Sequence, residues 1–154
     1  MFGLLRSPVT VAVVSATVLI AAVRSAEASS SHTTELSSPV IHESFTVLPC
    51  SGAAGHRSTL EQTGCAEHRI LRTDTKIDML NESIFAKLED DRARVRFIAA
   101  HKAWLSYRHA YCLSRSDVFQ GGTEAGVIDA ECDVALNTRH IKDLTEFDSD
   151  LSSG

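Results

Sequence analysis

The chain has 154 residues and a formal net charge of -5, and hydrophobic residues make up 44% of it whereas aromatic residues make up only 6%. This length predicts one domain, whose core has to be built mainly from aliphatic side chains. An acidic chain without a basic stripe is not typical of nucleic-acid-binding proteins, but its charge would attract a cationic partner.

The first 28 residues have the pattern of a secretory signal peptide. A positive charge at Arg6 precedes an apolar run from Val9 to Val23, which is short for a membrane span. Residues 26–28, Ala-Glu-Ala, match an A-x-A cleavage site, so we expect cleavage after Ala28. The alternative is an uncleaved membrane anchor. The signal-peptide interpretation predicts an exported product, periplasmic or secreted, that is not attached to a membrane after cleavage.

Residues 29–46 are polar and rich in serine and threonine, which predicts a flexible tether before a folded domain that begins at residue 47. All four cysteines lie after residue 28. An even number of cysteines in an oxidising compartment predicts two disulfides, and four cysteines allow three pairings. We favour the pairs that are close in sequence with an expected turn between them, Cys50–Cys65 and Cys112–Cys132.

Helical signals begin directly after this region. Residues 58–61, Ser-Thr-Leu-Glu, fit a capping box, which predicts a short helix from Thr59 to about His68. Either Thr73 or Asp74 could then cap a second helix.

Apolar residues recur at steps of three, four or seven between residues 75 and 114, as expected for an amphipathic helix. An unbroken helix of this length would be about 60 Å long, which is too long for a domain of this size. We therefore expect a turn at residues 88–91, where an aspartate can cap a new helix.

Gly121 and Gly122 indicate a loop at residues 116–122. The residues that follow predict a helix over residues 124–147 capped by Thr123, and then a polar tail at residues 148–154. The sequence shows no strand pattern and no internal repeat. The expected fold is a small, disulfide-stapled, all-α bundle of about four helices over residues 47–147.

One stretch, residues 101–112, holds the only tryptophan and both tyrosines. On a helix, Trp104, Arg108, Tyr111 and Cys112 share one side, and such a side is usually buried. We therefore interpret this stretch as a core helix pinned by a disulfide.

Residue spacings typical of catalytic or metal sites are missing from the sequence. His101 and His109 are eight residues apart, and neither an HExxH nor a CxxC motif occurs. The Asn81-Glu82-Ser83 sequon falls within a predicted helix and is interpreted as chance. These observations predict a protein that is not an enzyme and that needs no metal or cofactor.

The order of motifs along the chain is more informative. Two early cysteines, Cys50 and Cys65, precede a run with the pattern W-x-x-Y-R-x-x-x-C. A glycine pair, a further cysteine and a Thr-Arg pair follow this run. The residues of the run and of these later motifs are Trp104, Tyr107, Arg108, Cys112, Gly121, Gly122, Cys132, Thr138 and Arg139. This order resembles the exported LprI-type lysozyme-inhibitor domain family over residues 50–144. The motif residues are expected to be mainly structural. His109 replaces the family's usual aspartate, which implies that Arg108 needs another carboxylate as its partner.

The resemblance implies a binding protein that blocks a host or competitor lysozyme by occluding its cleft. Lysozymes are usually cationic and carry two catalytic carboxylates, which a basic side chain could reach. The basic candidates for this contact are Lys102, Arg108, Arg115 and Arg139, although core packing is the favoured role of Arg108. The alternative is a structural or stress-related protein of the cell envelope that does not contact lysozyme.

Overall fold

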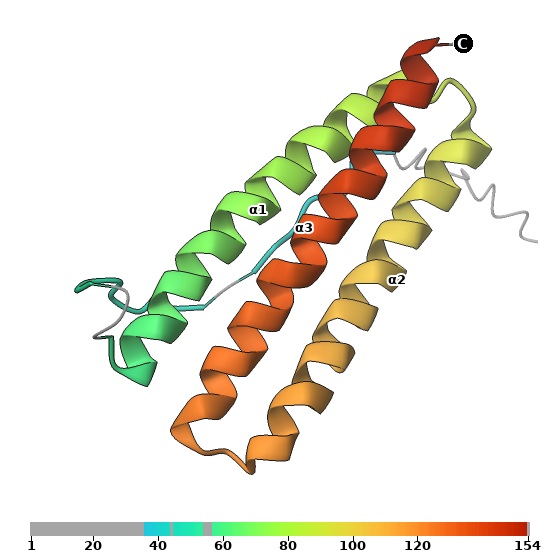
Figure 1. Cartoon of the computed structure of the whole chain (residues 1–154). Coiled ribbons are helices and arrows are strands. Elements are labelled where there is room, and N and C mark those ends of the chain that lie inside the picture. The colour runs from blue at the N-terminus through green and yellow to red at the C-terminus, as the bar shows by residue number, and fades with distance from the viewer. Residues whose placement is uncertain (1–35, 44, 54–56, 154) are drawn as a thin grey trace, which may run out of the picture. The chain divides into compact units, whose positions relative to one another are not determined.

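The computed structural model describes residues 36–43, 45–53 and 57–153, which contain three long helices and no strand. The helices are α1 (Thr59–Lys87), α2 (Asp91–Ser116) and α3 (Thr123–Ser153), and a short 3-10 helix, η2 (Asp117–Phe119), follows α2. α1 and α3 run in the same direction, and α2 runs in the opposite one (Figure 1). The all-α class is confirmed, with three helices in the described part instead of about four. The expected signal peptide lies outside the described residues.

The predicted start of α1 is confirmed, but the predicted end of this helix near His68 is not. Ser58 accepts a hydrogen bond from the Glu61 amide at 3.3 Å, and the Glu61 carboxylate accepts one from the Ser58 amide at 3.0 Å, which completes the capping box. The predicted break after His68 is wrong, because α1 continues unbroken for 29 residues. The two expected caps have other partners: the Thr73 hydroxyl bonds back to the Arg69 carbonyl, and Asp74 turns towards the other helices.

The predicted turn at residues 88–91 is confirmed. α1 ends at Lys87, and Leu88 adopts an extended conformation with its side chain buried. Asp90 then caps α2 by accepting a hydrogen bond from the Arg92 amide at 2.9 Å. A buried leucine followed by a capping aspartate thus reverses the chain.

α3 begins at Thr123, after a tight turn in which Gln120 and Gly121 have positive φ values of 50° and 74°. It extends to Ser153, so the predicted end at residue 147 and the polar tail are wrong. The Lys87 ammonium donates to the Asp148 carboxylate and to the Ser152 hydroxyl, both at 2.8 Å, and Leu151 packs against the core. These contacts hold the last turns of the helix.

The core consists of three small apolar clusters. The first combines α1 and α3 with the leucine of the turn and contains Ile77, Ile84, Leu88 and Leu144. The second lies near the start of α1 and contains Ala66, Ile70 and Ala130. The third surrounds the second disulfide and contains Cys112, Cys132 and Leu136. Each cluster is small, so polar contacts and cross-links carry a large share of the packing.

The segment before α1 contacts that helix, both within the described part of the predicted tether and just after it. The Ile41 amide donates to Asp78 at 2.9 Å, and the Leu48 amide donates to Glu67 at 2.6 Å. Because these partners come in reverse order along α1, the segment runs antiparallel to that helix. We call the described residues 36–43 and 45–53 the N-terminal segment, which is not helical and lies along α1.

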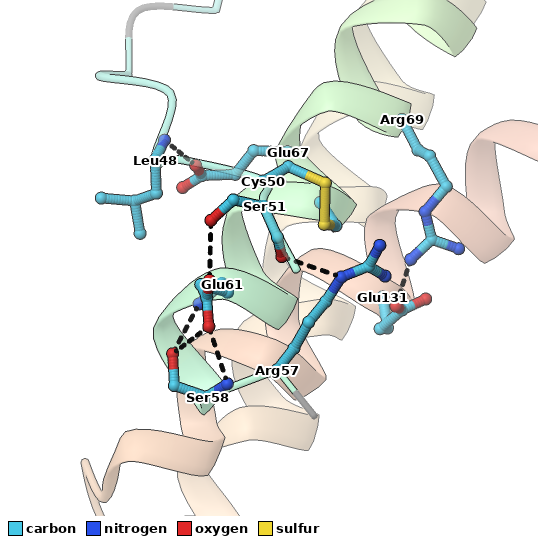
Figure 2. Close-up of a disulfide and its surroundings, with 10 residues drawn as sticks. Leu48, Cys50, Ser51, Arg57, Ser58, Glu61, Glu67, Arg69 and Glu131 are labelled. Carbon is cyan, nitrogen blue, oxygen red and sulfur yellow. Dashed lines mark hydrogen bonds and ion pairs between the residues drawn. A yellow bond between two sulfur atoms is a disulfide. The ribbon is translucent and has the colours of Figure 1, made fainter. Parts of the chain in front are cut away.

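Both favoured disulfide pairs are present. Cys50–Cys65 joins the end of the N-terminal segment to α1, and Figure 2 shows it beside the capping box. The Ser51 hydroxyl donates to the Glu61 carboxylate at 2.7 Å, and the Arg57 guanidinium donates to the Ser51 carbonyl at 3.3 Å. Cys112–Cys132 joins α2 to α3 within the core.

At Gly64 the backbone of the N-terminal segment lies directly against α1. A methyl group there would lie 2.6 Å from the Leu48 carbonyl oxygen and would also collide with the Pro49 carbonyl. We expect Gly64→Ala to lower the free energy of unfolding by about 1–3 kcal/mol, because backbone atoms must move. Urea denaturation measures this loss, and hydrogen exchange at the Leu48 amide should accelerate.

Gly126→Ala is the matched control, because its new methyl group would meet only the Thr63 side chain, at 3.5 Å or more. This change should raise stability by up to about 1 kcal/mol through helix propensity. Equal effects of the two substitutions would show that the close approach at Gly64 does not constrain the segment.

Candidate functional site

Polar residues interrupt the buried side of every helix. On α1 the buried series Ile70, Asp74, Ile77, Asn81 and Ile84 has helical steps of four and three, and two of its members are polar. The other helices contribute His101 and Arg108 from α2 and Asn137 from α3. These residues form two polar layers inside the core.

Arg108 is the centre of the first layer, which we call the Arg108 layer. Its guanidinium donates to Asp74 Oδ1 at 2.8 Å and to Asn137 Oδ1 at 2.7 Å, and it forms an ion pair with Glu43. Asn137 also donates to Asp74, at 2.7 Å. Arg108 is only 3% exposed, so one side chain joins α2 to α1, α3 and the N-terminal segment.

The carboxylates of this layer lie in a region from which water is largely excluded. Burial raises the pKa of Asp74 to about 6, and it raises that of Asp133, 3.9 Å from the Arg108 guanidinium, to about 6 as well. The positive charge of Arg108 opposes the shift at Asp133. At Asp74 a hydrogen bond from Asn137 opposes the shift instead.

The second layer contains two histidines and the tryptophan. Asn81 Nδ2 lies 3.2 Å from His101 Nδ1, and the His140 ring stacks on Trp104 with 3.9 Å between centroids. The Arg108 guanidinium also lies over the Trp104 ring, 5.2 Å from its centroid. Burial lowers the pKa of His101, and it lowers that of His140 to about 4, so both rings are neutral at pH 7.

The structure separates the four basic candidates for partner contact. Arg108 leaves this set, because its guanidinium is buried and engaged by internal acceptors. Lys102, Arg115 and Arg139 are exposed. Lys102 and Arg115 lie on α2, whereas Arg139 lies on α3 beside Thr138, whose hydroxyl bonds to the Val134 carbonyl.

The tyrosines lie outside the core. Tyr111 was expected on the buried side with Cys112, but it is 40% exposed and stacks on Tyr107, which is 53% exposed, with centroids 5.5 Å apart. A step of four residues links Ala103, Tyr107, Tyr111 and Arg115 along one side of α2, which we call the α2 stripe. Lys102 precedes Tyr107 by five residues and therefore projects from a different side.

Charge is divided unevenly between the helices. α2 contains six basic residues and one acidic residue, whereas α3 contains eight acidic residues and two basic ones. Among the three helices, α2 alone therefore has a net positive charge, and two exposed tyrosines lie on it. Tyrosine and arginine are the residue types enriched at the centres of protein interfaces.

Sequence reasoning missed most partners of Arg108 and of His101. Asp74, Asn81 and Asn137 are fully or almost fully buried, and none was among the predicted site residues. The signal was present, because Asn137 follows Val134 by three residues and precedes Ile141 by four, which places an amide on an apolar helix face. Glu43 lies in a stretch whose composition resembles a linker and carries no such signal.

Within the described ranges, no group of three or more His, Cys, Asp or Glu side chains is arranged to hold a metal ion. Among the helices described there, none combines the length and the apolar character needed to cross a membrane.

Comparison with known proteins identifies a family. The family model described as "Lysozyme inhibitor LprI" matches residues 50–144, which include both disulfides, Trp104 and Arg108. Neither a curated protein nor a solved structure matches the chain significantly. Since the matched region covers more than half of the sequence, the chain belongs to the LprI lysozyme-inhibitor family.

Proposed function

We propose that this protein binds a lysozyme and blocks access to its cleft. Family membership is the observation that carries this proposal. The two disulfides fit a place outside the cytoplasm, where a lysozyme would be met, in the periplasm or after secretion. The net charge of -5 favours encounter with a cationic enzyme.

The α2 stripe is the face that we assign to this contact. Arg115 is exposed and, within the described part of the chain, forms no ion pair. A guanidinium in this position could form a bidentate contact with a carboxylate in the lysozyme cleft. The stacked Tyr107 and Tyr111 rings would supply apolar contact area on a rigid helix.

Cell-wall lysis by a cationic lysozyme tests the proposal. Adding the purified protein in excess at low salt should slow the clearing of a cell-wall suspension, and added salt should weaken the effect through screening. An unchanged rate of clearing with correctly folded, oxidised protein would contradict lysozyme inhibition for the enzyme tested.

Variants of the α2 stripe test the assigned face. We expect Arg115→Glu and Tyr107→Ala each to weaken inhibition about tenfold or more, as truncation of an interface hot spot does. Lys102→Glu and Arg139→Glu are matched controls, because they place the same charge change on other exposed sides. If the control variants lose inhibition and Arg115→Glu does not, the contact face lies elsewhere.

A further inference from the structure

A cavity of about 230 Å³ lies between the three helices, away from the α2 stripe. Its apolar wall comes from α2 and α3 and consists of Phe97, Ala100, Leu144 and Phe147. Its polar wall consists of Asn81, His101 and His140 from the second polar layer, together with Asp143. An apolar chamber with a few polar groups on one side has the usual composition of a small-molecule site.

Three buried polar atoms on this wall have no hydrogen-bond partner in the described part of the chain: Asn81 Oδ1, His101 Nε2 and His140 Nε2. Asn81 is 0% exposed and His101 is 4% exposed. Unpaired buried polar atoms are uncommon in proteins, and three around one cavity need an explanation. A bound molecule with its own polar group would supply the missing partner.

The hydrogen bonds of Asn81 indicate which atoms are donors. Its Nδ2 donates to the Pro39 carbonyl at 3.3 Å and lies 3.2 Å from His101 Nδ1. Because an amide nitrogen can only donate, His101 Nδ1 is the acceptor. A neutral His101 then carries its proton on Nε2. Of the three unpaired atoms, His101 Nε2 is therefore an N–H donor and Asn81 Oδ1 a carbonyl acceptor, whereas the role of His140 Nε2 depends on its tautomer.

We propose that this cavity binds a small aromatic molecule with a hydroxyl group, of the phenol class. The ring would pack against the Phe97–Phe147 pair, whose own rings contact each other with centroids 6.2 Å apart and planes tilted by 56°. The hydroxyl would accept a hydrogen bond from His101 and donate one to Asn81. Since an apolar cavity of about 150 Å³ is sufficient for benzene, the volume here suits a substituted single ring. This site does not depend on lysozyme binding.

Titration with phenol tests the assignment, with benzene and anisole as ligands that lack the hydroxyl proton. Trp104 reports binding by fluorescence because His140 stacks on it, and calorimetry gives the affinities. We expect saturable binding of phenol, at least tenfold tighter than that of benzene or anisole. Absence of saturation up to the solubility limit, as expected if water alone fills the cavity, would overturn the proposal.

Two variants locate the binding site. His101→Phe should abolish the preference for phenol over benzene. Because this change could disturb folding, Ala100→Leu is the second variant: Ala100 is an exposed helix position that lines the cavity, and a larger side chain there should reduce phenol affinity at least tenfold. Unchanged phenol binding by the folded Ala100→Leu protein would overturn the proposal.

Discussion

Replacing Arg108 by methionine is expected to lower the free energy of unfolding by about 3–5 kcal/mol, the range measured when one partner of a buried ion pair is removed. Methionine keeps much of the side-chain volume, so the loss arises from charge and hydrogen bonding. Asp74 would lose its cation while remaining buried, and Asn137 and Glu43 would each lose a donor. The three parts of the fold that contact Arg108 would no longer be joined.

Urea denaturation followed by circular dichroism measures this effect. Arg115→Met provides the matched control, because Arg115 is exposed and the same substitution there should change stability by less than about 0.5 kcal/mol. Adding Asp74→Asn to the Arg108→Met protein should restore part of the loss, since an amide is less costly to bury than a carboxylate. If Arg108→Met unfolds at the same urea concentration as the wild-type protein, the Arg108 layer adds little to stability.

Removal of the Cys112–Cys132 disulfide is expected to cost about 3 kcal/mol in the chain-entropy model, because it closes a loop with a sequence separation of 20 residues. Alanine is the appropriate replacement for both cysteines, which are 1% and 2% exposed, because a serine hydroxyl would be buried without a partner. The pair also joins α2 to α3 within one of the small apolar clusters. Its loss should therefore loosen α2 more than the other helices.

The matched control for this prediction is the double alanine variant of Cys50 and Cys65, whose separation of 15 residues gives almost the same loop entropy. Cys50 is exposed, so this variant should disturb packing less and mainly release the N-terminal segment. Hydrogen exchange distinguishes the two outcomes helix by helix. Similar protection of α2 amides in both variants would contradict a special role for Cys112–Cys132.

Local signals predicted the fold where both partners of a contact are close in sequence. The capping box of Ser58 and Glu61 and the cap at Asp90 depend on residues two or three positions away, and both were identified. Thr73 and Asp74 carry an equally good local cap signal, yet α1 continues through them. Asp74 is held by Arg108, which is 34 residues away, and no local pattern contains that information.

The same limit applies to the end of α3 and to the candidate site. The local sequence places Asp148 in a polar tail, because its contact with Lys87 involves a residue 61 positions earlier. The sequence identified Trp104 and Arg108 as residues of a core helix, and it implied that Arg108 needs a carboxylate. It could not identify Glu43, Asp74 or Asn137 as the acceptors, because these come from three other parts of the chain.

The Arg108 layer also determines how the helices align along their length. Small aliphatic clusters offer similar contacts after one helix slides past another, so they discriminate weakly between alignments. A slip of α2 by one turn, about 5.4 Å, would carry the guanidinium away from Glu43, Asp74 and Asn137 at the same time. Misaligned conformations would therefore leave a bare charge inside the protein, and only the native alignment avoids this.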